Sequence, residues 1–133
     1  MEFVSFEIAK KLKEKGFSCE MPFAMYNEIA AFHLFTTSAP YNVCASGYKY
    51  REYYDYEDFD DHDYVCPTIS QVLKWLRNEK KIYVSVEVER EDWFEYKIVQ
   101  LIKNTRCTSS HVYETYNDAM LAGIKYILDN NLI

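Results

Sequence analysis

Glycine and proline are scarce in this chain, with three of each among 133 residues. Flexible linkers between domains are usually rich in glycine, serine or proline. The sequence therefore predicts a single domain that spans residues 1–133. A chain of this length buries roughly two-thirds of its unfolded surface, so its core does not depend on disulfides.

The cysteines contain no Cys-x-x-Cys pair, which argues against a zinc ribbon or a redox motif. They are Cys19, Cys44, Cys66 and Cys107. A charged segment followed by an apolar run is also missing, as is any apolar run of about 18 residues. We therefore expect no signal peptide, no membrane-spanning helix and a cytoplasmic protein with free thiols.

Common catalytic and metal-binding patterns are missing too, including Gly-rich phosphate loops, Gly-x-Ser-x-Gly and His-Glu-x-x-His. Cys107 and His111 resemble a nucleophile and a base, but four residues of extended strand span about 13 Å. A calcium loop starting at Asp58 fails, because Asp63 stands where the loop requires glycine and Ile69 where it requires glutamate. The sequence therefore predicts no catalytic residue, no cofactor and no metal site.

Acidic residues are concentrated between positions 52 and 64, a window that holds seven of the 21 acids and no lysine or arginine. Outside it, fifteen basic and fourteen acidic residues remain, so we expect no direct binding to nucleic acid. One interpretation of the window is a solvated loop. The alternative is an inhibitor that binds a basic DNA-binding protein by imitating phosphates.

Candidate partner-binding residues combine this window with both tryptophans. They are Asp55, Tyr56, Glu57, Asp58, Asp60, Asp61, Asp63, Trp75 and Trp93. Each tryptophan either flanks a partner surface or covers the edge of the core. The 13 tyrosines leave a further alternative, a small-ligand binder or enzyme with a tyrosine-lined pocket.

The strongest structural signal is a helix that leads into a strand. Pro67 precedes Thr68 and Gln71, which have the spacing of a capping box. One apolar stripe of this helix consists of Ile69, Val72, Leu73 and Leu76. After a polar turn at 78–81 the period becomes two, with one strand face formed by Ile82, Val84, Val86 and Val88.

Helical and strand patterns also occur on both sides of this segment. A first helix should end at Lys15, with Gly16 in the left-handed position and Phe17 against Leu12. A hairpin follows, with strands at 23–26 and 29–36 and a turn at Asn27-Glu28. Because both faces of its second strand are apolar, we expect a homo-oligomer.

The C-terminal part predicts two further strands and a helix. An odd hairpin loop would pair Val88 with Tyr96 and Val86 with Ile98, so that the apolar residues share a face. A third strand is expected at 106–113, and a last helix is expected to begin after Thr115 and to end at 130–131. The buried face of that helix should contain Met120, Leu121, Ile124, Ile127 and Leu128.

The predicted fold class is α+β, with three helices and a largely antiparallel sheet. The expected order is helix, two strands, an irregular acidic and tyrosine-rich segment at about 48–64, helix, three strands and helix. A short strand is expected at 48–54 within that segment. As a function, we expect a non-catalytic interaction or binding protein.

Three segments carry a resemblance to a known group of proteins. They are Leu12–Phe17 (LKEKGF), Pro67–Arg77 (PTxxQxxKWLR) and Tyr113–Ala119 (YETYNDA). In these segments the chain resembles short uncharacterised proteins that are encoded by phages and mobile elements of gut Bacteroidetes. The resemblance implies such an origin and assigns no activity, substrate or catalytic residue.

Overall fold

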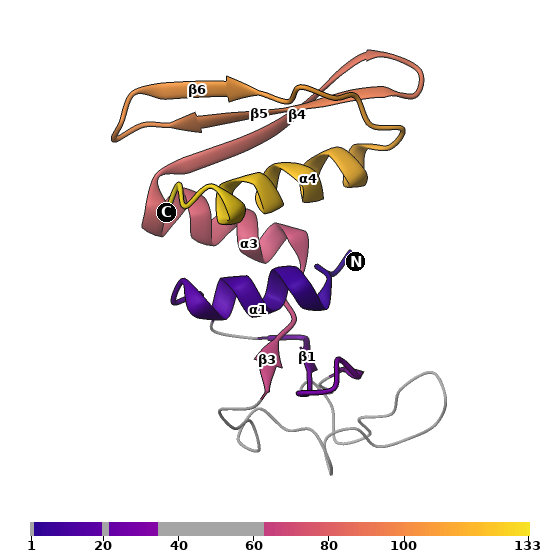
Figure 1. Cartoon of the computed structure of the whole chain (residues 1–133), viewed down its shortest axis with the longest axis vertical. Helices are drawn as coiled ribbons and strands as arrows, with labels where there is room; N and C mark the ends of the chain where they lie inside the picture. Colours follow the sequence, from indigo (N-terminus) through magenta and orange to yellow (C-terminus); the bar gives the residue numbers. More distant parts are fainter. Residues whose placement is uncertain (1, 20–21, 35–62) are drawn as a thin grey trace. The chain divides into compact units, whose positions relative to one another are not determined.

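The computed structural model describes residues 2–19, 22–34 and 63–133 (Figure 1). The chain divides into two compact units, one within residues 3–68 and one formed by residues 69–133 together with Glu2. The predicted α+β class is confirmed, with three helices and only antiparallel strand pairings among the described residues. The strands form two separate three-stranded sheets. The expectation of a single domain stays a prediction.

The helix of the first unit, α1 (Phe6–Glu14), ends as the sequence predicts. Gly16 has a φ of 79°, in the left-handed region that residues with a Cβ rarely adopt. The Phe17 N–H donates to Leu12 O at 3.0 Å, and the Gly16 N–H donates to Lys13 O at 3.1 Å. These two bonds form a Schellman motif and satisfy carbonyls that the last turn would otherwise leave unpaired.

The sheet of the first unit has the order β2-β1-β3. Its strands are β1 (Ala24–Tyr26), β2 (Phe32–Leu34) and β3 (Tyr64–Val65). The sequence did not predict β3, a two-residue strand that pairs with Met25 and Tyr26. The predicted strand at 48–54, residues 35–36 of the predicted second strand and the acidic window up to residue 62 lie outside the described residues.

The predicted two-residue turn of the first hairpin is wrong. Strands β1 and β2 are joined by five residues, 27–31, because Tyr26 pairs with Phe32. The Asn27 Oδ1 accepts hydrogen bonds from the Ile29 N–H (3.1 Å) and the Ala31 N–H (2.9 Å). The side chain of Asn27 thus accepts the hydrogen bonds that a neighbouring strand would otherwise accept from these amides. Ile29 therefore lies in an exposed loop and not in a strand.

In the second unit, α3 (Ile69–Trp75) begins directly after Thr68, as predicted. It continues into the π-helical turn η2 (Leu76–Lys80), so the predicted polar turn at 78–81 is wrong. The Lys81 N–H donates to Leu76 O, five residues earlier, and Lys81 ends the helix with a φ of 55°. The wider helical turn therefore keeps the backbone of this polar stretch hydrogen-bonded.

The sheet of the second unit has the order β4-β5-β6. Its strands are β4 (Ile82–Arg90), β5 (Trp93–Gln100) and β6 (Thr105–Thr108). Val86 pairs with Tyr96 and Val88 with Phe94, a shift of two residues from the predicted register. An even shift keeps the side chains on the same faces, so the predicted face is correct although the predicted partners are wrong.

A β-bulge explains this difference in register. The register shifts between Val88 and Arg90, and Arg90 pairs with Trp93 across a two-residue turn. The bulge places one extra residue in β4 between these two pairs. The hairpin can therefore have a two-residue turn while the apolar residues of β4 and β5 still share a face. On the other face, Glu87 lies opposite Glu95, and the Glu87 Oε1 contacts the Lys97 Nζ at 2.8 Å.

The last helix, α4 (Tyr116–Asp129), begins where its capping residue predicts, because the Thr115 Oγ1 accepts a hydrogen bond from the Asp118 N–H at 3.0 Å. The helix ends as predicted at 130–131, because Asn131 has a φ of 51° and turns the chain out of the helix. The Leu132 N–H then donates to Ile127 O at 3.1 Å. The buried residues of the helix are Ala119, Met120, Gly123, Ile124, Ile127 and Leu128. Leu121, predicted to be buried, is half-buried.

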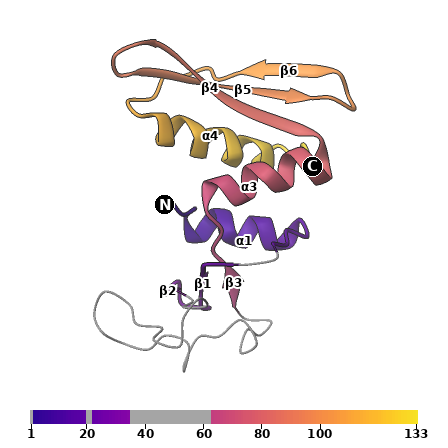
Figure 2. The ribbon, with the colours of Figure 1, turned by 180° about the vertical axis from the view of Figure 1, so that it is seen from behind.

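Helix α4 lies along one face of the β4-β5-β6 sheet (Figures 1 and 2). The helix approaches the sheet closely at Gly123, where a Cβ atom would lie 3.0 Å from Val84 Cγ1 and 3.2 Å from Tyr96 Cγ. Over the described ranges, we find no helix with both the length and the apolar character needed to cross a bilayer.

Candidate functional site

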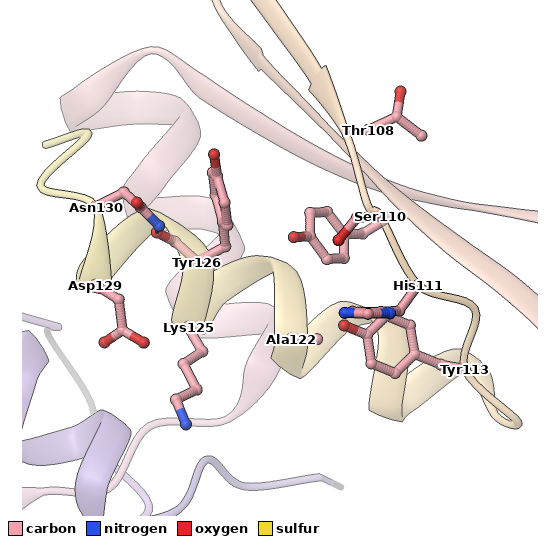
Figure 3. A pocket seen from close by; sticks show the side chains of 10 residues that line it. Thr108, Ser110, His111, Tyr113, Ala122, Lys125, Tyr126, Asp129 and Asn130 are labelled. Atoms are coloured by element: carbon pink, nitrogen blue, oxygen red, sulfur yellow. The ribbon is translucent and has the colours of Figure 1, made fainter.

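A cleft of about 390 Å³ lies between α4 and the chain that leaves β6 (Figure 3). Three tyrosines and several hydroxyl, amide and charged side chains surround it. The lining residues are Tyr96, Thr108, Ser110, His111, Tyr113, Ala122, Lys125, Tyr126, Asp129 and Asn130. All of them belong to the second unit, so one compact unit supplies the whole cleft.

The helix side of the cleft is a stripe of α4 that runs beside its buried face. It consists of Ala122, Lys125, Tyr126, Asp129 and the C-cap residue Asn130. Their spacing of three or four residues places them on one side of the helix. The sheet therefore holds α4 by one face while the adjacent face lines the cleft.

The strand side of the cleft depends on an interruption of the strand ladder after β6. The Ser109 N–H donates to Tyr96 O at 3.0 Å, and Tyr113 exchanges two bonds of 2.9 Å with Phe94. Residues 110–112 thus face the single residue Glu95 of β5. The predicted strand at 106–113 is correct only to Thr108, because these extra residues leave the ladder.

Further hydrogen bonds hold this interrupted segment. The Ser109 Oγ accepts from the Tyr96 N–H at 3.3 Å and donates to His111 O at 2.9 Å. Because the segment is attached to β5 at both ends, Ser110 and His111 have fixed backbone positions at the rim of the cleft.

The tyrosine rings of the cleft pack against one another. The centroid of Tyr96 lies 6.2 Å from that of Tyr113 and 6.0 Å from that of Tyr126, with tilts of 33° and 43°. Tyr96 is buried, whereas 38% of Tyr126 is exposed. The pKa of Tyr96 is raised mainly by burial and further by its neighbours Tyr113, Cys107 and Tyr126. Its hydroxyl therefore stays protonated at neutral pH.

Three of the predicted partner-binding residues, Asp63, Trp75 and Trp93, are described by the structure, and these three do not line the cleft. Only 7% of Trp75 is exposed, and the Lys80 Nζ lies 5.3 Å from its ring centroid. Trp93 is half-buried, and the Arg90 Cζ lies 4.1 Å from its ring centroid. The Trp93 Nε1–H donates to Glu95 Oε1 at 3.2 Å. Trp75 therefore offers little surface to a partner.

Of the acidic candidates, the structure describes Asp63, whose backbone oxygen accepts a hydrogen bond from the Lys13 Nζ at 2.9 Å. The others lie outside the described residues, and their role stays a prediction. They are Asp55, Tyr56, Glu57, Asp58, Asp60 and Asp61.

The described cysteines are Cys19, Cys66 and Cys107, all of them free thiols. Burial raises the pKa values of Cys19 and Cys66 to about 11, and it also raises the pKa of Cys107. His111 lines the cleft, but Cys107 is not among the lining residues. Within the described ranges, no three His, Cys, Asp or Glu side chains are grouped closely enough to hold a metal ion.

Of the cleft residues, the sequence singled out only His111 as a candidate functional residue, and it did not predict which residues lie around it. One usable signal is Tyr126, an aromatic residue in the otherwise polar or small stripe of α4. The other side of the cleft depends on the interrupted ladder after β6, which no residue pattern in the sequence predicts.

Compared with models of protein families, with curated proteins and with solved structures, the chain gives no match.

Proposed function

We propose that this chain is a non-catalytic binding protein and that its ligand occupies the tyrosine-lined cleft. The observation that carries the proposal is the grouping of three tyrosines with hydroxyl and amide side chains around one hollow. The cleft volume of about 390 Å³ falls within the range of roughly 300–1,000 Å³ found for small-ligand sites.

The way the cleft is built also supports ligand binding. Strand β5 fixes the segment around Ser110 through backbone bonds, and the sheet fixes α4 through its buried face. A site that is formed before binding loses less conformational entropy when the ligand arrives.

Binding is favoured over catalysis because the nucleophile and the base considered in the sequence do not share the cleft. Of the nucleophile and base considered in the sequence, only His111 lines the cleft. The raised pKa of Cys107 also disfavours the thiolate that would act as a nucleophile.

The proposal can be tested by titrating the labelled protein with a library of small polar compounds and recording amide NMR spectra. We expect saturable shifts confined to the cleft, at residues such as Ser110, Tyr113 and Tyr126. Replacing Tyr126 with alanine should weaken binding about tenfold, since roughly 50 Å² of ring surface buried by a ligand contributes on the order of 1.4 kcal/mol.

The matched control is Tyr116→Ala, which removes an exposed tyrosine of the same helix that does not line the cleft. It should leave the affinity unchanged. Shifts that are spread over the surface, or an affinity that Tyr126→Ala does not change, would overturn the proposal.

A second candidate function rests on the seven acids of residues 52–64. In that alternative the window binds a basic protein, and binding weakens as salt rises. Neutralising Asp58, Asp60, Asp61 and Asp63 to asparagine separates the two functions. Cleft binding should survive this change, whereas capture of a basic protein should be lost.

Cellular context belongs to the same proposal. The free thiols at Cys19, Cys66 and Cys107 support a cytoplasmic location, where thiols stay reduced. An origin in a phage or mobile element rests on the three segments of sequence resemblance. Self-association rests on exposed apolar side chains of the first unit, including Ile29 and Phe32.

A further inference from the structure

We propose that the ligand of the cleft is a neutral carbohydrate. This inference rests on the binding function proposed above and names the ligand class of the same site. Three features carry it: the ring surface, the kind of polar groups at the rim, and the balance of charge.

The ring surface suits the apolar C–H faces of a sugar. Figure 3 shows Tyr126 rising from α4, and 38% of this residue is exposed. The Tyr96 ring packs beside it with 6.0 Å between the centroids. An aromatic ring offers a broad apolar face, and its hydroxyl offers a polar tip. A pyranose presents the same combination, with C–H groups on its faces and hydroxyls around its edge.

The rim of the cleft carries groups that both donate and accept hydrogen bonds. Thr108 and Ser110 supply hydroxyls, His111 an imidazole and Asn130 an amide. The Asn130 Nδ2 donates to Tyr126 O at 2.9 Å, which fixes the orientation of this amide beside the exposed ring. Sugar hydroxyls are themselves donors and acceptors, so mixed groups of this kind match them.

Charge disfavours ionic ligands. The charged lining residues Lys125 and Asp129 have opposite signs, and both point away from Thr108 and Ser110 (Figure 3). Anion sites usually gather several cationic or N–H donors, and the Lys125 ammonium is directed away from Thr108 and Ser110. The Asp129 carboxylate, which would attract a cation, is directed away from them as well.

The packing of the rings also argues against a site for quaternary ammonium groups. Such sites place aromatic faces around the cation. Here the buried Tyr96 ring packs against Tyr113 and Tyr126, with centroid distances of 6.2 and 6.0 Å, so these ring contacts are made between tyrosines.

The test is a set of amide NMR titrations of the whole chain with maltotriose, cellotriose and N,N′-diacetylchitobiose. Inorganic phosphate and choline serve as ionic comparison ligands. We expect at least one neutral oligosaccharide to shift Ser110, Tyr126 and Asn130 saturably, and neither ionic ligand to do so.

Variants separate the ring from its hydroxyl. Tyr126→Phe keeps the ring and should lower sugar affinity only a few-fold, whereas Tyr126→Ala should lower it about tenfold. Tyr116→Ala should have no effect. Equal effects of Tyr126→Phe and Tyr126→Ala would contradict the stacking argument and overturn the proposal.

Failure of this inference can be distinguished from failure of the proposed function. If compounds of the polar library bind the cleft but no oligosaccharide does, the carbohydrate assignment is wrong and the binding function stands. If phosphate or choline shifts the cleft residues instead, the charge argument is wrong. If nothing binds the cleft, both proposals fail.

Discussion

Gly123 shows how a single missing side chain determines where a helix meets a sheet. A Cβ atom there would lie 3.0 Å from Val84 Cγ1 and 3.2 Å from Tyr96 Cγ. Both neighbours belong to hydrogen-bonded strands, and the valine side chain is stiff about χ1. The close approach that glycine permits also sets the position of the α4 side of the cleft.

Replacing Gly123 with alanine should destabilise the protein although alanine is the better helix former. Helix propensity favours alanine by about 1 kcal/mol, whereas overpacking typically costs about 1–3 kcal/mol. We expect a net loss of about 1 kcal/mol in the free energy of unfolding, measured by urea denaturation. Adding Val84→Ala should relieve the contact, so the double variant should lose less than the two single variants together. A more stable Gly123→Ala protein would contradict this account.

The ends of the helices were predicted well from the sequence, because they depend on local residue patterns. Gly16 and Thr115 stand where helices end or begin because each satisfies a local requirement of the backbone, and α3 begins directly after Thr68. Strand register and loops were predicted less well. The bulge after Val88 and the interrupted ladder after Thr108 depend on pairing between distant residues, which local patterns do not contain.

The same distinction explains the candidate site. The excess of tyrosine predicted a tyrosine-lined pocket as one alternative, but not which tyrosines form it. Tyr96, Tyr113 and Tyr126 come from three different segments, and only the folded sheet and helix bring them together.

The cap of α4 gives a prediction at the scale of an element. Thr115→Ala removes the acceptor of the Asp118 N–H bond and should cost about 1 kcal/mol of unfolding free energy. Thr115→Ser keeps the hydroxyl and should stay close to the native value. A urea titration of both variants is sufficient, and equal losses in the two would show that the hydroxyl bond is not the cause.

At the scale of the whole molecule, the expected self-association can be measured by native mass spectrometry. We expect multiples of the single-chain mass at micromolar concentration. Replacing Ile29, which is 78% exposed in the first unit, with serine should lower the oligomer fraction. The matched control is Ile102→Ser in the second unit, at a side chain that is 81% exposed. A single-chain mass for the unmodified protein would contradict the expectation.

The position of the tryptophans has a spectroscopic consequence. Both Trp75 and Trp93 belong to the unit of residues 69–133, and residues 3–68 contain none. Tryptophan emission excited at the red edge of the absorption band therefore reports on one unit alone, while far-ultraviolet circular dichroism reports on helices in both. Comparing the two signals in one denaturation experiment separates the unfolding of the cleft-bearing unit from that of the rest of the chain.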